Sequence, residues 1–434
     1  MTTRRTRCSL CFAILLSLLG AGPEPAPAQW LGPEFQVNSY TTGTQYRPVI
    51  AAAANGNFGV VWRTYQQDGS SFGLAGRWFD SAANARGSDF QVNTYTSGYQ
   101  VLPAMASDNF GHFVVVWTSV GQDGSGSGVF GQQFDAIGNP VGGEFQINTY
   151  TTSDQTEPAV AADDSGGFVV VWAGLPDGQS TGIHGQRFDA SGVKVGSEFQ
   201  INTYSTNQQG HPSVTVNGSG DIVVVWQSAL QDGSGQGIFG RRFDAAGVPL
   251  AGEFQVNTYT TSDQTYPAIA TDDAGGFIVA WRSTGQDGSE FGVFGKRFDA
   301  AGGAQGSEFQ VNTYTTGYQG IPSVAIAGPG SFVVVWESSQ GGSGSGSFGQ
   351  RYDADGSPRG SEFQVNTTTT GYQGYPAVAA DAIGNFVVAW SGDGNQAGEG
   401  TSVFGKQLTT AIFTDDFERG HTCAWSASVG GGCP

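Results

Sequence analysis

Residues 158–202 read PAVAADDSGGFVVVWAGLPDGQSTGIHGQRFDASGVKVGSEFQIN and contain four runs with strand character. Pro158–Ala162 is short and compatible with a β-strand, and Gly167–Trp172 is almost continuously apolar, as in a strand buried on both faces. Gly182–Asp189 and Glu198–Asn202 alternate apolar and polar residues. None of these runs has a helical period, so the stretch predicts one small four-stranded sheet.

The same stretch recurs along the chain with a period of 54 or 55 residues. Three markers keep one phase through seven copies: the Phe of E-F-Q-V/I-N, the Trp of V-V-W and a Pro. The Phe residues are Phe35, Phe90, Phe145, Phe199, Phe254, Phe309 and Phe363. The Trp residues are Trp62, Trp117, Trp172, Trp226, Trp281, Trp336 and Trp390. The Pro residues are Pro48, Pro103, Pro158, Pro212, Pro267, Pro322 and Pro376.

Four strands per unit and seven units predict an all-β fold, a single seven-bladed β-propeller of four-stranded blades. An open array would leave each small sheet with exposed edges, which a closed ring avoids. We expect each innermost strand to begin at the Pro, and E-F-Q-V-N to be outermost. The chain then starts with an unpaired outer strand, Glu34–Asn38, and ends with three strands, Pro376–Ala380, Asn385–Trp390 and Val403–Leu408. We expect the N-terminal strand to complete that last blade and close the ring.

The flanking segments predict secretion. Residues 1–28 carry Arg4, Arg5 and Arg7, a short apolar run and a terminal Ala-Pro-Ala, which is typical of a signal peptide. The propeller is expected over 29–408, followed by a tail, 409–434, in which Cys423 and Cys433 are expected to pair in an oxidising compartment. No later segment is apolar enough to span a membrane. The net charge of −19 disfavours nucleic acid as a partner, and we expect a soluble extracellular or cell-surface monomer.

The wording of the repeat, V-V-W…Q-D-G-S…F-G-Q-R-F-D…E-F-Q-V-N, resembles repeats of bacterial extracellular proteins, many of them adhesin-like. The resemblance covers roughly residues 33–408 and implies no particular chemistry. The segment 415–425 resembles a D-x-F-E-x-G-x-x-x-x-W ending of secreted bacterial proteins, from which it departs by carrying Cys423.

Function is expected on the face that carries the longer links, those between the second and third strands and those between blades. At two positions on that face, next to the repeated Pro and Trp, the seven copies carry different residues. Before the Pro stand Arg47, Leu102, Glu157, His211, Tyr266, Ile321 and Tyr375. After the Trp stand Arg63, Thr118, Ala173, Gln227, Arg282, Glu337 and Ser391. Our candidate ligand-binding residues are Arg47, Glu157, His211, Tyr266, Tyr375, Arg63, Arg282 and Glu337; the alternative is that exposed positions simply drift.

Residues that all copies share are expected to be structural. A Gln three residues before each Pro is expected to satisfy backbone groups of the loop between blades, and the Asp after each F-G-Q-R-F to form an Asx-type turn. The seven Trp are expected in the core between blades. The pairs Asp163, Asp164 and Asp272, Asp273 are weak candidates for Ca²⁺, because each turn lacks the several oxygen ligands that calcium needs. No cofactor is otherwise expected.

Catalysis finds little support in the sequence. The four His occupy four different repeat positions, and no HExxH, GxSxG or Cys-His pattern occurs. We therefore predict a secreted, non-enzymatic binding module that recognises a glycan or a protein. Two alternatives stay open: a secreted polysaccharide hydrolase or lyase with its site at the channel mouth, and a Ca²⁺-stabilised structural surface protein.

Overall fold

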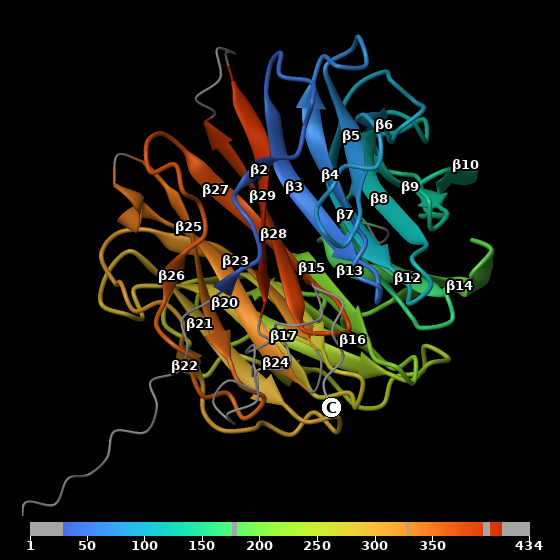
Figure 1. Cartoon of the computed structure of the whole chain (residues 1–434). Coiled ribbons are helices and arrows are strands. Elements are labelled where there is room, and N and C mark those ends of the chain that lie inside the picture. Colours follow the sequence, from blue (N-terminus) through green and yellow to red (C-terminus); the bar gives the residue numbers. More distant parts are fainter. Residues whose placement is uncertain (1–28, 176–179, 328–329, 343, 394–399, 410–434) are drawn as a thin grey trace, which may run out of the picture.

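The computed structural model describes residues 29–175, 180–327, 330–342, 344–393 and 400–409. The strands form seven antiparallel sheets arranged as the blades of a seven-bladed propeller (Figure 1). One 3-10 turn, η1 (Ser339–Gly341), interrupts the β-structure. The described residues contain no helix long and apolar enough to cross a membrane. The expected signal peptide, and the tail with Cys423 and Cys433, lie outside the described residues.

The innermost strands lie side by side around the axis of the ring. They are β3 (Gln45–Ala52), β7 (Gln100–Ser107), β11 (Gln155–Ala162), β15 (Gln209–Val216), β19 (Gln264–Thr271), β23 (Gln319–Ala327) and β27 (Gln373–Ala380). Each begins three residues before the Pro, so our expectation that the Pro starts the strand is wrong. The ladder tolerates the missing N–H because a β-bulge lies there: in β11 the register shifts between Thr156 and Ala159.

The second strands carry the V-V-W motif and are almost wholly buried. They are β4 (Phe58–Tyr65), β8 (Phe113–Val120), β12 (Phe168–Gly174), β16 (Ile222–Ala229), β20 (Phe277–Thr284), β24 (Ser331–Ser338) and β28 (Asn385–Asp393). Sheets packed on both faces need such continuous apolar runs. Each strand continues past its Trp, which places the variable residue after the Trp within the ladder rather than in a loop.

The third strands are β5 (Phe72–Phe79), β9 (Ser127–Phe134), β13 (Gly182–Phe188), β17 (Gln236–Phe243), β21 (Phe291–Phe298), β25 (Gly346–Tyr352) and β29 (Thr401–Thr409). The outermost strands are β6 (Phe90–Gln91), β10 (Pro140–Gln146), β14 (Lys194–Gln200), β18 (Phe254–Gln255), β22 (Phe309–Gln310) and β26 (Phe363–Gln364), with β2 (Phe35–Gln36) in the last blade. Only the Phe-Gln pair of E-F-Q-V-N enters the ladder in most blades, so the outer strand is shorter than the motif.

The apolar core is divided into seven clusters, one between each pair of neighbouring blades. The cluster between the third and fourth blades, for example, joins Val169 and Val171 to Val224 and Trp226. All seven motif tryptophans are fully buried. A blade therefore buries its apolar faces only against its neighbours, which is why the ring must close.

Closure follows the predicted route. In β2, Phe35 pairs with Gly405 and Gln36 pairs with Phe404 of β29. Figure 1 shows the blue N-terminal strand lying against the red strands of the last blade. A further short strand that the sequence did not predict, β1 (Gln29–Trp30), pairs with the far end of β29.

A repeated polar contact also joins the blades on the outside. The acidic residue that precedes the outer-strand Phe accepts hydrogen bonds from the Thr that follows the outer strand of the preceding blade. Glu198 accepts from the backbone and hydroxyl of Thr149 at 2.8 and 2.7 Å. Glu34 accepts from Thr367 at the same two distances, across the junction of the chain ends. The junction thus has the same bond as an ordinary blade interface.

Candidate ligand-binding pocket at the channel mouth

The loops between blades are held by a buried Asn and a buried Gln. Asn148 accepts from the Val129 amide at 2.8 Å and donates to the Tyr150 carbonyl at 2.9 Å and to Gln155 Oε1 at 3.1 Å. Gln155 in turn donates to the Thr152 carbonyl at 3.0 Å. Equivalent bonds recur in the other blades, for example in the fourth. The repeated Gln residues are therefore loop supports, as the sequence predicts, and they leave the mouth to other side chains.

The residue before each Pro has a left-handed backbone conformation in all seven blades. The φ angles range from 47° at His211 to 55° at Glu157 and Tyr266. Side chains larger than Gly seldom adopt this conformation, and a following Pro restricts the backbone further. Because Leu102 and Ile321 share it, the conformation belongs to the bulge and is required by the fold. Because of this bulge, the residue before the Pro is not paired in the β-ladder, and it lines the pocket.

All seven of these side chains meet in one pocket of about 480 Å³, and their prolines line it too. Around the ring the order is Arg47, Leu102, Glu157, His211, Tyr266, Ile321 and Tyr375. Two apolar residues, Leu102 and Ile321, thus separate two polar groups. One polar group comes from the third to fifth blades, and the other comes from the seventh and first.

The first polar group is Glu157, His211 and Tyr266. The Glu157 carboxylate accepts from the His211 amide at 2.8 Å, and its other oxygen lies 3.5 Å from Nδ1 of the same residue. The imidazole packs on Tyr266 with ring centroids 4.5 Å apart. Burial lowers the pKa of His211 below its usual value of 6.5; the charge of Glu157 opposes this, and those of Arg47 and Arg282 add to it. The imidazole is therefore neutral at neutral pH.

The second polar group is built around Arg47 and Tyr375. Arg47 Nη2 donates to the Tyr375 hydroxyl at 3.0 Å, and its guanidinium carbon lies 4.5 Å from the ring centroid. Below them, Glu337 Oε2 accepts from the Tyr375 amide and the Tyr372 hydroxyl, both at 3.1 Å. Tyr46 packs edge-on against Tyr375 with centroids 4.8 Å apart, and burial foremost raises the pKa of Tyr46 to about 12. The phenol of Tyr46 therefore stays protonated in the physiological range.

The residues after the Trp take a different role from those before the Pro. In the described residues none of them lines the central pocket. Glu337 is buried, and Ser391 and Gln227 accept hydrogen bonds from the amides of Arg47 and Tyr266, the bulge residues of the next blades. Arg63 and Arg282 are half-buried and stack on aromatic rings. This second varying position supports the pocket from below.

Sequence reasoning missed Tyr46 and Tyr372, which complete the second polar group. Tyr46 stands two residues before Pro48 and Tyr372 four residues before Pro376, at places where the copies also differ. Tyr46, for example, corresponds to Thr156 and Gly210 of other blades. The rule that found Arg47 and Tyr375, disagreement between copies, would have found these two as well.

The opposite face carries the short turns, and its acidic residues cap backbone amides. Asp163 accepts from the amides of Ser165 and Gly167 at 2.8 and 3.0 Å, and Asp272 accepts from the amide of Gly276 at 2.8 Å. Asp164 and Asp273 are exposed. Within the described ranges no three His, Cys, Asp or Glu side chains gather as a metal site would require.

The Asp after the third strand forms the expected Asx turn, as in Asp80 with the amides of Ala82 and Asn84.

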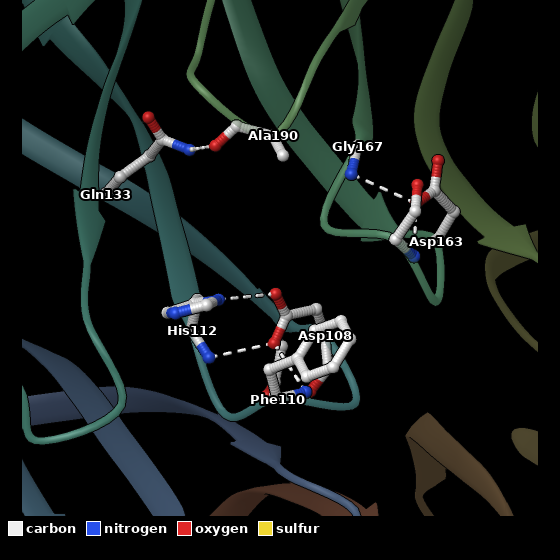
Figure 2. A network of polar contacts seen from close by, with 9 residues as sticks. Asp108, Phe110, His112, Gln133, Asp163, Gly167 and Ala190 are labelled. Carbon is white, nitrogen blue, oxygen red and sulfur yellow. Dashed lines mark hydrogen bonds and ion pairs between the residues drawn. The ribbon is translucent and has the colours of Figure 1, made fainter.

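A second hollow of about 340 Å³ lies on this face beside His112. Figure 2 shows His112 Nδ1 bonded to Asp108 at 2.7 Å, with Phe110 at the tip of the turn and Gln133 reaching the Ala190 carbonyl. The last blade repeats the arrangement with Asn385 on Asp381 at 2.8 Å. His112 therefore replaces an amide in a turn that other copies also form.

Neither a protein-family model nor a curated protein matches the sequence. Solved structures do resemble the fold. A protein of unknown function from Dyadobacter fermentans is 10% identical over 88% of this chain and 99% of its own, with a TM-score of 0.52. The polysaccharide lyase Uly1 is 10% identical over 91% of this chain and 94% of its own, with a TM-score of 0.52. An α-L-arabinanase of Penicillium chrysogenum, complexed with arabinobiose, is 13% identical over 73% and 95%, with a TM-score of 0.50. At such identities the likeness establishes the propeller fold and nothing more.

Proposed function

We propose that the protein is an extracellular glycan-binding propeller whose pocket at the channel mouth holds one or two sugar residues. The observation that carries the proposal is the pocket itself: one backbone frame presents seven different side chains around about 480 Å³. That volume falls in the range of about 300–1,000 Å³ usual for small-molecule sites.

The chemistry of the lining suits a sugar. A sugar ring presents hydroxyls that both donate and accept, together with apolar C–H faces. Glu157 can accept, Arg47 can donate, and the Tyr375 hydroxyl and neutral His211 can do both. Leu102 and Ile321 with the proline ring offer the apolar contact. Two of the similar propellers, the polysaccharide lyase and the arabinanase with arabinobiose, connect this architecture with carbohydrate.

Binding is favoured over hydrolysis by the count of carboxylates. Glycoside hydrolases usually need two, about 5–10 Å apart on either side of the scissile bond. Glu157 is the one carboxylate of the described residues that lines the pocket, and it already accepts from His211. Glu337 is buried beneath Tyr375 and bonded to its amide.

The test is an array of glycans and polysaccharides with release of reducing ends monitored. We expect retention without release. Leu102→Trp should abolish retention by filling the pocket, whereas Ile137→Trp on the exposed opposite face should leave it unchanged. Melting temperatures of both variants verify folding. Failure to retain any glycan, or retention that Leu102→Trp does not reduce, overturns the proposal; release of reducing ends replaces binding with catalysis.

A further inference from the structure

The pocket of this acidic protein has a positively charged side. The chain holds 37 Asp and Glu against 18 Lys and Arg. Yet Arg47 lines the pocket, and Arg63 lies near the same ring: both guanidinium carbons are within 6 Å of the Tyr46 ring centroid, at 5.9 and 5.3 Å. The ion pairs of the described residues join Arg77 to Asp89, His112 to Asp108, His211 to Glu157 and Arg359 to Asp353. In the described part of the chain, therefore, Arg47 and Arg63 have no carboxylate partner.

Both arginines also keep unused donors. The Nε atoms of Arg47 and Arg63 are inaccessible to solvent and have no hydrogen-bond partner among the described residues. Burying a polar group without a hydrogen-bond partner destabilises the folded protein, and more so when the group is charged. The pKa of Arg63 is lowered by burial first and then by the like charge of Arg47. Arg47 is held by the Tyr375 hydroxyl and both guanidinium groups lie over aromatic rings, but in the described residues no carboxylate pairs with either of them.

The fifth blade shows what a compensated arginine looks like. Arg282 occupies the position of Arg63 and stacks on Phe291 at 4.5 Å, as Arg63 stacks on Phe72 at 4.4 Å. The Nε of Arg282 donates to Thr265 Oγ1 at 3.1 Å, across the strand pair. In the first blade the corresponding partner is Tyr46, whose ring offers no such acceptor to Arg63. The first blade is therefore the one where an acceptor is missing.

From this geometry we infer that the glycan is acidic, and that its carboxylate or sulfate group lies on Arg47 beside the Tyr375 hydroxyl. The inference rests on the proposed glycan-binding function and adds the class of ligand. A planar guanidinium matches the oxygens of a carboxylate or sulfate with paired hydrogen bonds. The positive charge of Arg63, which pairs with no carboxylate in the described residues, adds to the attraction for an anion. The opposite polar group, Glu157 with His211 and Tyr266, is then left to bind sugar hydroxyls.

The experiment measures, by calorimetry, binding of three oligosaccharides of equal length: oligogalacturonate, a sulfated galacto-oligosaccharide and the neutral galacto-oligosaccharide. We expect at least one acidic ligand to bind about tenfold or more tightly than the neutral one, as a charged hydrogen bond would give. Arg47→Gln should remove that difference, Arg47→Lys should restore part of it, and Arg63→Gln should reduce it a few-fold. Added salt should weaken acidic binding selectively.

Arg86→Gln is the matched control, because it removes one positive charge from an exposed residue on the opposite face. It should leave all three affinities unchanged. Neutral binding as tight as acidic binding, or an Arg47→Gln variant that weakens all three ligands equally, overturns the acidic-ligand inference and leaves glycan binding standing. Failure of the three ligands to bind, while the array retains neutral glycans, overturns it too. Failure of the array to retain anything refutes the proposed function instead.

Discussion

The two faces of the ring use the same seven-fold backbone in opposite ways. On the short-turn face, the side chain just before the last residue of the third strand repeatedly reaches the next blade: Arg187 donates to the Ala246 carbonyl at 2.6 Å and Gln133 to the Ala190 carbonyl at 3.2 Å. Gln407 makes the same contact across the closure, with the Ser81 carbonyl at 3.0 Å. Arg and Gln side chains thus make the same hydrogen bond between neighbouring blades.

At the channel mouth one backbone position carries side chains with different tasks. Arg47, His211 and Ile321 share a bulge and a left-handed φ, yet they offer a cation, a neutral ring and an alkyl group to one pocket. The contrast teaches that a repeat fixes where a side chain emerges, and that its chemistry can vary between copies at the channel mouth while the short-turn face keeps one kind of contact. Substitutions of residues that all blades share should therefore reduce stability more than substitutions at the varying positions of the channel mouth.

The largest effect is expected from a core residue that every blade shares. Trp226→Ala should lower the free energy of unfolding by about 3–5 kcal/mol, because a fully buried ring between two blades is lost. Leu102→Ala, at the varying position, should cost under about 1 kcal/mol, because this side chain is only partly buried and faces the pocket. Urea unfolding followed by circular dichroism measures both. Equal losses would show that the mouth is as structural as the core.

The buried loop supports should come next. Asn148→Ala should cost about 1–3 kcal/mol, since it leaves the Val129 amide and Gln155 without their partner. The control is Asn84→Ala, which removes an exposed amide bonded to Asp80 in an Asx turn and should cost well under half as much. The same unfolding assay applies. A larger loss at Asn84 would contradict the role given to the interblade loop.

The bulge position should tolerate glycine. Ile321→Gly should keep the free energy of unfolding within about 1 kcal/mol, because Gly relieves a left-handed conformation that costs a β-branched residue about 1–2 kcal/mol. Val324→Gly, three residues along the same strand and buried, should cost several times more. Comparable losses at both sites would mean that the left-handed backbone carries no strain.

The smallest effect concerns pH. The folded-state pKa of His211 lies below 6.5, so between that pKa and 6.5 the unfolded chain binds more protons and stability falls as pH falls. Above that window His211 contributes no pH dependence. His211→Asn should therefore lose less stability than the wild type between pH 7 and pH 5. Unfolding curves at both pH values measure the difference; an identical loss in the two proteins would place the folded-state pKa of His211 at its ordinary value, and a smaller loss in the wild type would place it above.

Much of the fold, and most residues of the pocket, could be predicted from the sequence. The spacing of Phe and Trp gave the ring, and the phase of Glu34–Asn38 gave its closure, because a strand pattern and a missing strand are both visible within single repeats. The position before the Pro carries different residues in the seven repeats. This variation identified Arg47, Glu157, His211, Tyr266 and Tyr375, which the fold brings into one pocket. Agreement between the pattern and the geometry was possible because one bulge places every copy identically.

Other features depend on contacts between blades, which no single repeat displays. The Arg47–Tyr375 bond joins residues 328 positions apart across the closure. Glu337 is buried, and its carboxylate accepts a hydrogen bond from the Tyr375 amide of the next blade at 3.1 Å. The strand start at Gln155 could not be anticipated from the Pro rule, because a bulge permits a residue without an N–H inside a ladder.

The bond from Thr367 to Glu34 has a topological consequence. This contact repeats the one between Thr149 and Glu198, so the N-terminal strand is bonded to the preceding blade as the outer strand of an ordinary blade is. The order of the blades in the polypeptide is then separable from their order in space. A circular permutant that links the present ends through a flexible connector and opens at another interblade loop should regain the same seven interfaces.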